Sequence, residues 1–193
     1  MIVAILLSLH TVLTGYSIAF AVGITLAILC NLHDMARAII MPIANICRPI
    51  SAIALYPVIV MYIGIGFWAR VFVLTWISLP VVMINTLHAL DTVKQEVIDA
   101  AKLETNALNI MWLVRLPMSY KSIISTLNVT VSTTWVGLTA AEMLGASDGL
   151  GFKILEAAQS FNYPLMYTYI LIISAIGFSM SYGMSKIYNK MEN

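Results

Sequence analysis

Residues 96–117 read EVIDAAKLETNALNIMWLVRLP, and this stretch decides how the rest of the chain is arranged. Seven of the nineteen charged side chains lie within it or just before it. They are Asp91, Lys94, Glu96, Asp99, Lys102, Glu104 and Arg115. Apolar residues recur between them near helical spacing, at Val97, Ala101, Leu108, Met111 and Trp112. The pattern predicts an amphipathic helix or helix pair, ended by Pro117, with a surface suited to docking into a partner protein.

The chain on either side of this stretch is mostly apolar. Of its 193 residues, 61% are hydrophobic and 10% are charged, and the mean hydropathy is +0.92. The surface of a soluble domain does not tolerate this composition, so we interpret the chain as an integral membrane protein. The net charge of +1 and the absence of clustered Lys and Arg argue against a nucleic-acid partner.

Five membrane spans are predicted from the apolar runs, at residues 11–32, 38–66, 67–90, 122–141 and 165–185. The first has twenty-two residues without a charge, enough to cross about 30 Å of hydrocarbon at about 1.5 Å per residue. The second must be kinked or broken, because it contains Pro42, Arg48-Pro49 and Pro57. Residues 64–66 then form a turn, and a turn-rich loop at 145–151 leads into a short amphipathic piece.

An odd number of spans places the two ends of the chain on opposite sides. Lys186 and Lys190 predict a cytoplasmic tail, because Lys and Arg are enriched on that side of membranes. Most other basic residues then fall on the same side: Arg37, Lys94, Lys102, Arg115 and Lys121. Met1 is predicted outside and Asn193 in the cytoplasm, with the first apolar helix as its own insertion signal. Arg70 is interpreted as an ordinary interface anchor.

Three stretches resemble the permease subunits of ABC importers. Asp99-Ala100-Ala101, Lys102 and the later Leu116-Pro117 are similar to the EAA loop of that family, the cytoplasmic segment that inserts into a cleft of the ATPase subunit. RPISAIALYPVIVMYIGIG at 48–66 and WVGLTAAEMLGASDGLGFKI at 135–154 resemble the branch that imports nitrate, taurine and alkanesulfonates. Together the matches cover about residues 14–188.

The resemblance implies an all-α, polytopic type I importer transmembrane domain, with residues 1–193 as one domain and a coupling loop at about 91–117. It implies an inner-membrane homodimer in the lipid bilayer, a separate ATPase that holds ATP and Mg, and an extracytoplasmic solute-binding protein. The family often has one more helix before this point, so the chain is either a minimal version or naturally begins upstream. The residues expected to contact the ATPase are Glu96, Asp99, Ala100, Ala101, Lys102, Leu116 and Pro117.

Two positions depart from the family's loop. Asp99 stands where glutamate is usual, which keeps the carboxylate. Thr105 or Asn106 replaces the usual glycine, and we expect Asn106 to supply a left-handed turn, since asparagine adopts that conformation at lower cost than most residues.

No enzyme motif is present. The sequence lacks HExxH, a CxxC pair, GxSxG and GxxxxGK[ST], so no catalytic residue, metal site or cofactor of its own is predicted, and ATP hydrolysis is expected in another subunit. The alternative function is a passive channel or a non-transporting membrane assembly subunit, which would not require the 91–117 loop.

Six residues are candidates for a solute path: Arg48, Thr126, Thr130, Thr133, Thr134 and Glu142. Arg48 either faces the path or is held at headgroups or by a carboxylate such as Glu142. The threonines either line a pore or pack helices together, and Glu142 either contacts solute or caps the loop after it. The expected solute is a small anion such as a sulfonate, taurine or nitrate, with a neutral vitamin precursor as the alternative.

Overall fold

The computed structural model describes residues 2–192, except for the side chains of residues 53, 127 and 187–192. Every regular element in this range is helical, which confirms the all-α prediction. The helices are α1 (Ile2–Leu32), α2 (Asp34–Cys47), α3 (Ala52–Ile63), α4 (Phe67–Asp91), α5 (Gln95–Lys102), α6 (Ala107–Ile110), α7 (Leu116–Gly145), α8 (Leu150–Gln159) and α9 (Tyr163–Glu192). A π-helical turn, η1 (Met111–Arg115), joins α6 to α7.

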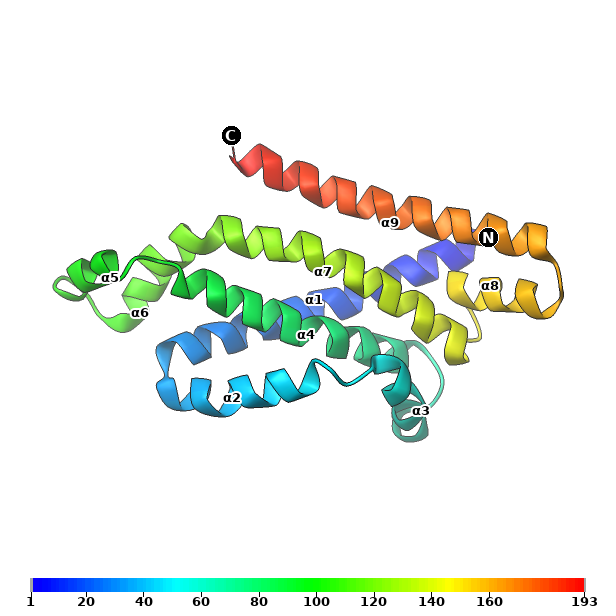
Figure 1. Cartoon of the computed structure of the whole chain (residues 1–193), viewed down its shortest axis with the longest axis horizontal. Coiled ribbons are helices and arrows are strands. Elements are labelled where there is room, and N and C mark those ends of the chain that lie inside the picture. Colours follow the sequence, from blue (N-terminus) through cyan, green and yellow to red (C-terminus); the bar gives the residue numbers. More distant parts are fainter. Residues whose placement is uncertain (1, 193) are drawn as a thin grey trace.

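The long helices run lengthwise in an elongated bundle (Figure 1). Helix α4 packs against both α1 and α7. The approach of α1 to α4 is close because α1 has glycine at the contact. A Cβ on Gly15 would lie 2.8 Å from the Leu74 Cβ, so a larger residue at position 15 would push the two helices apart.

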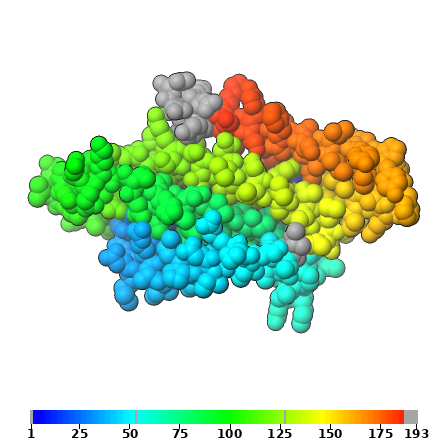
Figure 2. Space-filling view, in the orientation of Figure 1, coloured from blue at the N-terminus to red at the C-terminus, as the bar shows by residue number. Residues whose placement is uncertain are grey.

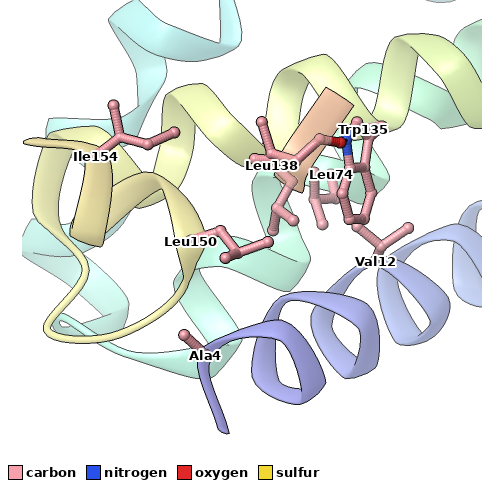
Figure 3. Close-up of a cluster of buried hydrophobic side chains, with 8 residues drawn as sticks. Ala4, Val12, Leu74, Trp135, Leu138, Leu150 and Ile154 are labelled. Carbon is pink, nitrogen blue, oxygen red and sulfur yellow. The ribbon is translucent and has the colours of Figure 1, made fainter. Parts of the chain in front are cut away.

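The largest apolar cluster of the described residues joins five helices, α1, α4, α7, α8 and α9. Ala4 and Val12 of α1, Leu74 of α4, Trp135 of α7 and Leu150 of α8 contribute to it (Figure 3). The indole Nε1 of Trp135 donates a hydrogen bond of 3.0 Å to the carbonyl of Ile173, which ties α7 to α9. The short helix α8 is thereby fixed against the membrane helices.

Three described helices are long and apolar enough to cross a membrane: α1, α4 and residues 163–186 of α9. These correspond to the first, third and fifth predicted spans. The first helix begins at Ile2 and not at residue 11, since the preceding residues are also apolar and helix-forming. Helix α7, the predicted fourth span, has 30 residues and carries many hydroxyl groups.

The second predicted span is two helices with a break at residues 48–51. Pro42 and Pro57 lie inside α2 and α3 and do not end them, so only the Arg48-Pro49 site breaks the segment. With 14 and 12 residues, neither helix alone crosses about 30 Å at about 1.5 Å per residue. Gly64 and Gly66 form the predicted turn into α4, with φ of 88° and 154°, in the region that favours glycine.

The two ends of the bundle carry different elements (Figure 1). One end holds α5, α6 and the α1–α2 connection, and the other holds the start of α1, the α3–α4 turn and α8. Helix α9 starts beside α8 and runs back toward the α5–α6 end. Met1 and Asn193, for which opposite sides were predicted, lie outside the described residues.

Candidate functional site

The predicted helix pair forms around a small core of its own. Val93, Ile98 and Ile110 are buried together, and Ala101 and Val114 pack against them. Pro117 does not end this segment, as the sequence reasoning expected, because α6, η1 and α7 form one continuous helix through it. The wider turn before it is closed by a bond from the Leu116 N–H to the Met111 carbonyl. A shift to π spacing loosens the turn into which the proline ring must fit.

The connection between α5 and α6 needs no left-handed residue. Asn106 is extended, with φ of −81° and ψ of 160°, so the expected left-handed turn at this residue is wrong. Instead, the N–H groups of Leu103 and Glu104 donate to the carbonyls of Ala100 and Ala101. The helix therefore tightens in its last turn before the chain leaves it, and no residue at 103–106 has positive φ.

The five predicted coupling residues on α5 fall on two faces. Glu96, Asp99, Ala100 and Lys102 are exposed at the tip of the molecule, where the 91–117 segment projects (Figure 2). Ala101 is half-buried against the core of the helix pair. Leu116 and Pro117 lie apart from these residues, at the start of α7. The outward face of α5 thus carries the small side chain of Ala100 between the charged side chains of Asp99 and Lys102.

The charges on this face are held by local contacts. The Lys102 Nζ lies 2.8 Å from the Asp99 Oδ1, and the Gln95 Nε2 donates to the same oxygen at 2.9 Å. Hydrogen bonds from Lys102 and Gln95 lower the pKa of the Asp99 carboxyl below its ordinary value. Asp99 is therefore ionised at neutral pH, and the face presents a fixed pair of opposite charges.

A second set of polar contacts ties the helix pair to the bundle. Arg37 of α2 donates to both carboxylate oxygens of Asp91, at 2.7 and 3.3 Å, and Asn31 of α1 donates to Asp91 at 3.0 Å. Arg115 of η1 donates to the Asn31 side-chain carbonyl. These contacts connect α1, α2, α4 and η1 at the α5–α6 end.

The break after α2 borders a cavity of about 450 Å³ that also lies against α3, α4 and α7. Arg48 and Thr133, two of the predicted path residues, both line it. Arg48 is exposed, and no carboxylate lies within salt-bridge distance of it among the described residues. The expected alternative, a pair with Glu142, is not formed.

The other threonines of the stripe serve packing. Thr126, Thr130 and Thr134 are buried, and each donates its hydroxyl to the carbonyl four residues before it, at 2.7–3.1 Å. The Thr134 hydroxyl also lies 2.6 Å from that of Ser78 on α4. The structure therefore brings Thr133 to the cavity and favours the helix-packing interpretation for its three neighbours.

Glu142 is fully buried near the C-terminal end of α7 and does not line the cavity. Its carboxylate accepts hydrogen bonds from the Ser8 hydroxyl at 2.6 Å and from the Gly151 N–H at 2.8 Å. The Arg70 guanidinium lies 3.8 Å from it and 2.7 Å from the carboxylate of Asp148. These contacts favour the capping and pairing interpretation of Glu142.

Arg70 was interpreted as an interface anchor, and this was wrong, since its side chain is 4% exposed. The acidic partner groups come from α7 and the loop before α8, far away in sequence. A signal was available: Arg70 and Glu142 are opposite charges at the ends of apolar spans, at positions that the alternating topology places at the same membrane face.

Comparison with known proteins gives the family of this chain. Residues 19–192 match the family described as the binding-protein-dependent transport system inner membrane component. The chain belongs to this family. Its permease fold, its transport function and its place as a multi-pass inner-membrane subunit, all predicted from the sequence, are thereby confirmed.

Named relatives of this permease span most of its length. It is 26% identical over 185 residues to the taurine transport system permease protein TauC of Escherichia coli, covering 95% of this chain and 67% of TauC. It is 28% identical to the putative ABC transporter permease protein MJ0413 of Methanocaldococcus jannaschii, covering 96% of this chain and 70% of the relative.

Solved structures support the fold of the permease. A chain of the MetNI methionine ABC transporter, in inward-facing conformations, superposes with a TM-score of 0.84 at 19% identity, covering 98% of this chain and 94% of that chain. A chain of an amino acid ABC transporter with histidines gives a TM-score of 0.77 at 20% identity, covering 99% and 92%.

The loop that closes over Glu142 gives a test of the buried cluster. Gly149 has φ of 105°, and a Cβ at this residue would overlap the Glu142 carboxyl. We expect Gly149→Ala to lower the thermal unfolding temperature of the detergent-solubilised permease, because alanine is strained at positive φ and displaces Glu142. Gly183→Ala is the matched control, since nothing lies within 4 Å of the added Cβ. Equal stability of the two variants would contradict the close packing of this loop.

Proposed function

We propose that this permease imports a small organic or inorganic anion, such as a sulfonate, taurine or nitrate, by alternating access. Two copies pair around a central path, a separate ATPase subunit supplies energy from ATP and Mg, and an extracytoplasmic binding protein delivers the solute. The relatives support this solute class: TauC is named for taurine, and the putative permease protein SsuC of Bacillus subtilis, 21% identical, is named for aliphatic sulfonates.

The observation that carries the proposal is the unpaired Arg48 on the wall of the cavity. An arginine within a membrane segment is costly unless it is paired or hydrated. The broken segment 48–51 adds freed backbone groups, which also need protein or water around them. A cavity open to water satisfies both requirements, and a guanidinium on its wall attracts anions through paired N–H donors.

Coupling to the ATPase is assigned to the outward face of α5. Its small Ala100 permits close approach of a partner, and Asp99 and Lys102 can set the register of the contact. The α5–α6 end then lies in the cytoplasm, together with the C-terminal end of α9, and the start of α1 lies outside. Closure of two ATPases would move the two helix pairs and switch the bundle between discrete states.

Replacing Arg48 with glutamine tests the path. We expect uptake of labelled taurine or alkanesulfonate into proteoliposomes to fall about tenfold, because the charge that attracts the anion is lost. Assembly with the ATPase should remain unchanged, since the α2–α3 connection, which carries Arg48, lies far from α5 in the bundle (Figure 1). Arg48→Lys keeps the charge and should retain most uptake. Unchanged uptake in Arg48→Gln, or a loss explained by failed assembly, would remove Arg48 from the path.

A neutral solute is the second candidate, because one relative is the formylaminopyrimidine transport permease protein ThiX of Halalkalibacterium halodurans, 22% identical. With a neutral solute, Arg48→Gln would leave uptake intact. A passive channel is separated from both by ATP dependence: uptake through a channel continues when ATP is omitted.

A further inference from the structure

We infer that Asn31 passes the movement of the helix pair α5–α6 to helices α1, α2 and α4, so that the walls of the cavity move together during transport. Asn31 is a positioning residue in this role, because it acts through Asp91 and Arg115 rather than on solute or ATP. The inference rests on the proposed function and names a residue on which its coupling step depends.

The side chain of Asn31 bridges the two ends of the segment that contains the helix pair. Its Nδ2 donates to the Oδ1 of Asp91 at 3.0 Å, and its Oδ1 accepts a hydrogen bond from Arg115. Asp91 ends α4, where the chain enters the segment, and Arg115 ends η1, where the chain leaves it. A side-chain amide can make both contacts because it carries a donor and an acceptor. One residue in the last turn of α1 therefore holds both ends of the segment.

Helices α1, α2 and α4 form one packed unit beside this contact. Six buried residues of the three helices belong to one apolar cluster: Ala27, Cys30, Ala44, Met83, Ile84 and Leu87. Arg37 of α2 also donates to both carboxylate oxygens of Asp91. A close-packed cluster has low compressibility and moves as a unit. A displacement of Asn31 or Asp91 therefore reaches all three helices.

The helix pair packs mainly on itself and not on α1. Among the described residues, its core of Val93, Ile98 and Ile110 includes none from α1 or α2. A cavity of about 300 Å³ lies between the helix pair and the end of α1, where Asn31 and Leu32 line it. This space gives the helix pair room to move against α1. The polar contacts of Asn31 therefore determine how far α1 follows.

The movement reaches two walls of the larger cavity by different routes. The helix pair continues through η1 into α7, which lines one wall with Thr133. Another wall carries Arg48, which follows α2, and the first turn of α2 contacts Asp91 through Arg37. The contacts of Asn31 join the two routes where they begin, so that both walls are displaced together.

The experiment measures whether η1 and α2 move as one unit. Spin labels are placed at Leu113 on η1 and Ala38 on α2, both exposed, after replacement of the two native cysteines by alanine. The permease–ATPase complex is assembled in nanodiscs with an excess of unlabelled permease, so that most dimers carry one labelled copy. We expect ATP with vanadate to leave the distance between the labels unchanged with Asn31 in place and to change it by about 2 Å or more in Asn31→Leu. Asn45→Leu is the matched control, since Asn45 is exposed on α2 outside these contacts, and it should behave as the wild type.

Transport gives a second readout. Asn31→Leu should hydrolyse ATP at the wild-type rate, because Asn31 lies outside the outward face of α5. Uptake of labelled taurine or butane-1-sulfonate per ATP hydrolysed should fall about fivefold, the factor that corresponds to the net free energy of one hydrogen bond. A merely structural role would instead lower the thermal unfolding temperature, hydrolysis and uptake together and leave the ratio of uptake to hydrolysis unchanged.

An exchange of two side chains tests the hydrogen bonds themselves. Asn31→Asp removes the donor to Asp91 and places a second carboxylate beside it, so this variant should lose coupling as Asn31→Leu does. Adding Asp91→Asn supplies a donor opposite the new carboxylate, and Arg37 and Arg115 each keep an acceptor. The double variant should recover most of the wild-type uptake per ATP.

A label distance that changes equally in the wild type and in Asn31→Leu, or in neither, would overturn the inference. So would a double variant with no better coupling than Asn31→Asp. If the wild-type complex does not hydrolyse ATP, the proposed importer function itself fails. If the wild type hydrolyses ATP and takes up solute while Asn31→Leu does both equally well, that function stands without a role for Asn31.

Discussion

Replacing Ala100 with arginine should abolish association of the permease with its ATPase and, with it, ATP-driven uptake. Ala100 lies on the exposed face of α5, and its methyl group allows a partner surface to approach closely. An arginine at this position adds bulk and a third charge between Asp99 and Lys102, which clashes with any complementary cleft. The measurement is recovery of the ATPase when tagged permease is purified from membranes.

Ala100 is a sharper choice than its neighbour Ala101, which packs against the core of the helix pair. Arginine at position 101 would disturb the local fold as well as the contact. Ala38→Arg serves as the matched control, because Ala38 is exposed on α2 and lies outside the helix pair. Full recovery of the ATPase with Ala100→Arg at normal permease levels would rule out this face as the coupling surface.

Arg70→Met should destabilise the permease by about 3–5 kcal/mol, the usual effect of removing one partner from a buried ion pair. The change leaves the carboxylate of Glu142 buried without its counter-charge, and that of Asp148 without its 2.7 Å contact. Adding Glu142→Gln removes the remaining buried charge and should restore part of the loss. Thermal unfolding of the purified permease in detergent measures both effects.

The control for this prediction is Arg37→Met, which breaks a pair of similar geometry at the surface. Arg37 and Asp91 have side chains that are 44% and 30% exposed, so solvent can replace the contact and the effect should stay near or below about 1 kcal/mol. If Arg70→Met is no more harmful than Arg37→Met, the buried cluster does not stabilise the bundle.

The membrane helices could be predicted from the sequence because their apolar runs are long and bounded by clear turn residues. The turn at Gly64–Gly66 and the start of α4 at Phe67 follow directly from such boundaries. Proline was a poorer guide. Pro42 and Pro57 remain within helices, and Pro117 follows a π turn that no local pattern announces. At Pro117 the π spacing of the preceding turn makes room for the proline ring.

Only some of the residues that line the cavity could be predicted from the sequence. Arg48 and the hydroxyl face of α7 stand out in an apolar sequence, and the structure places Arg48 and Thr133 on one wall. For Arg70 the sequence offers only the opposite charge of Glu142 as a signal. Its burial and its contact with Asp148 depend on segments far away in sequence.

The continuous helix from Ala107 to Gly145 is held in place at one of its two ends. Its 39 residues measure about 58 Å at about 1.5 Å per residue. The Arg70–Glu142 cluster holds the α8 end, while a force from the ATPase would enter beside α6. Between these two ends, the hydroxyls of Thr126, Thr130 and Thr134 donate to carbonyls that also accept the backbone hydrogen bonds of the helix. Such side-chain hydrogen bonds make a helix easier to bend. We expect the helix to bend there, beside the start of the α7 segment that lines the cavity from Thr133 onward.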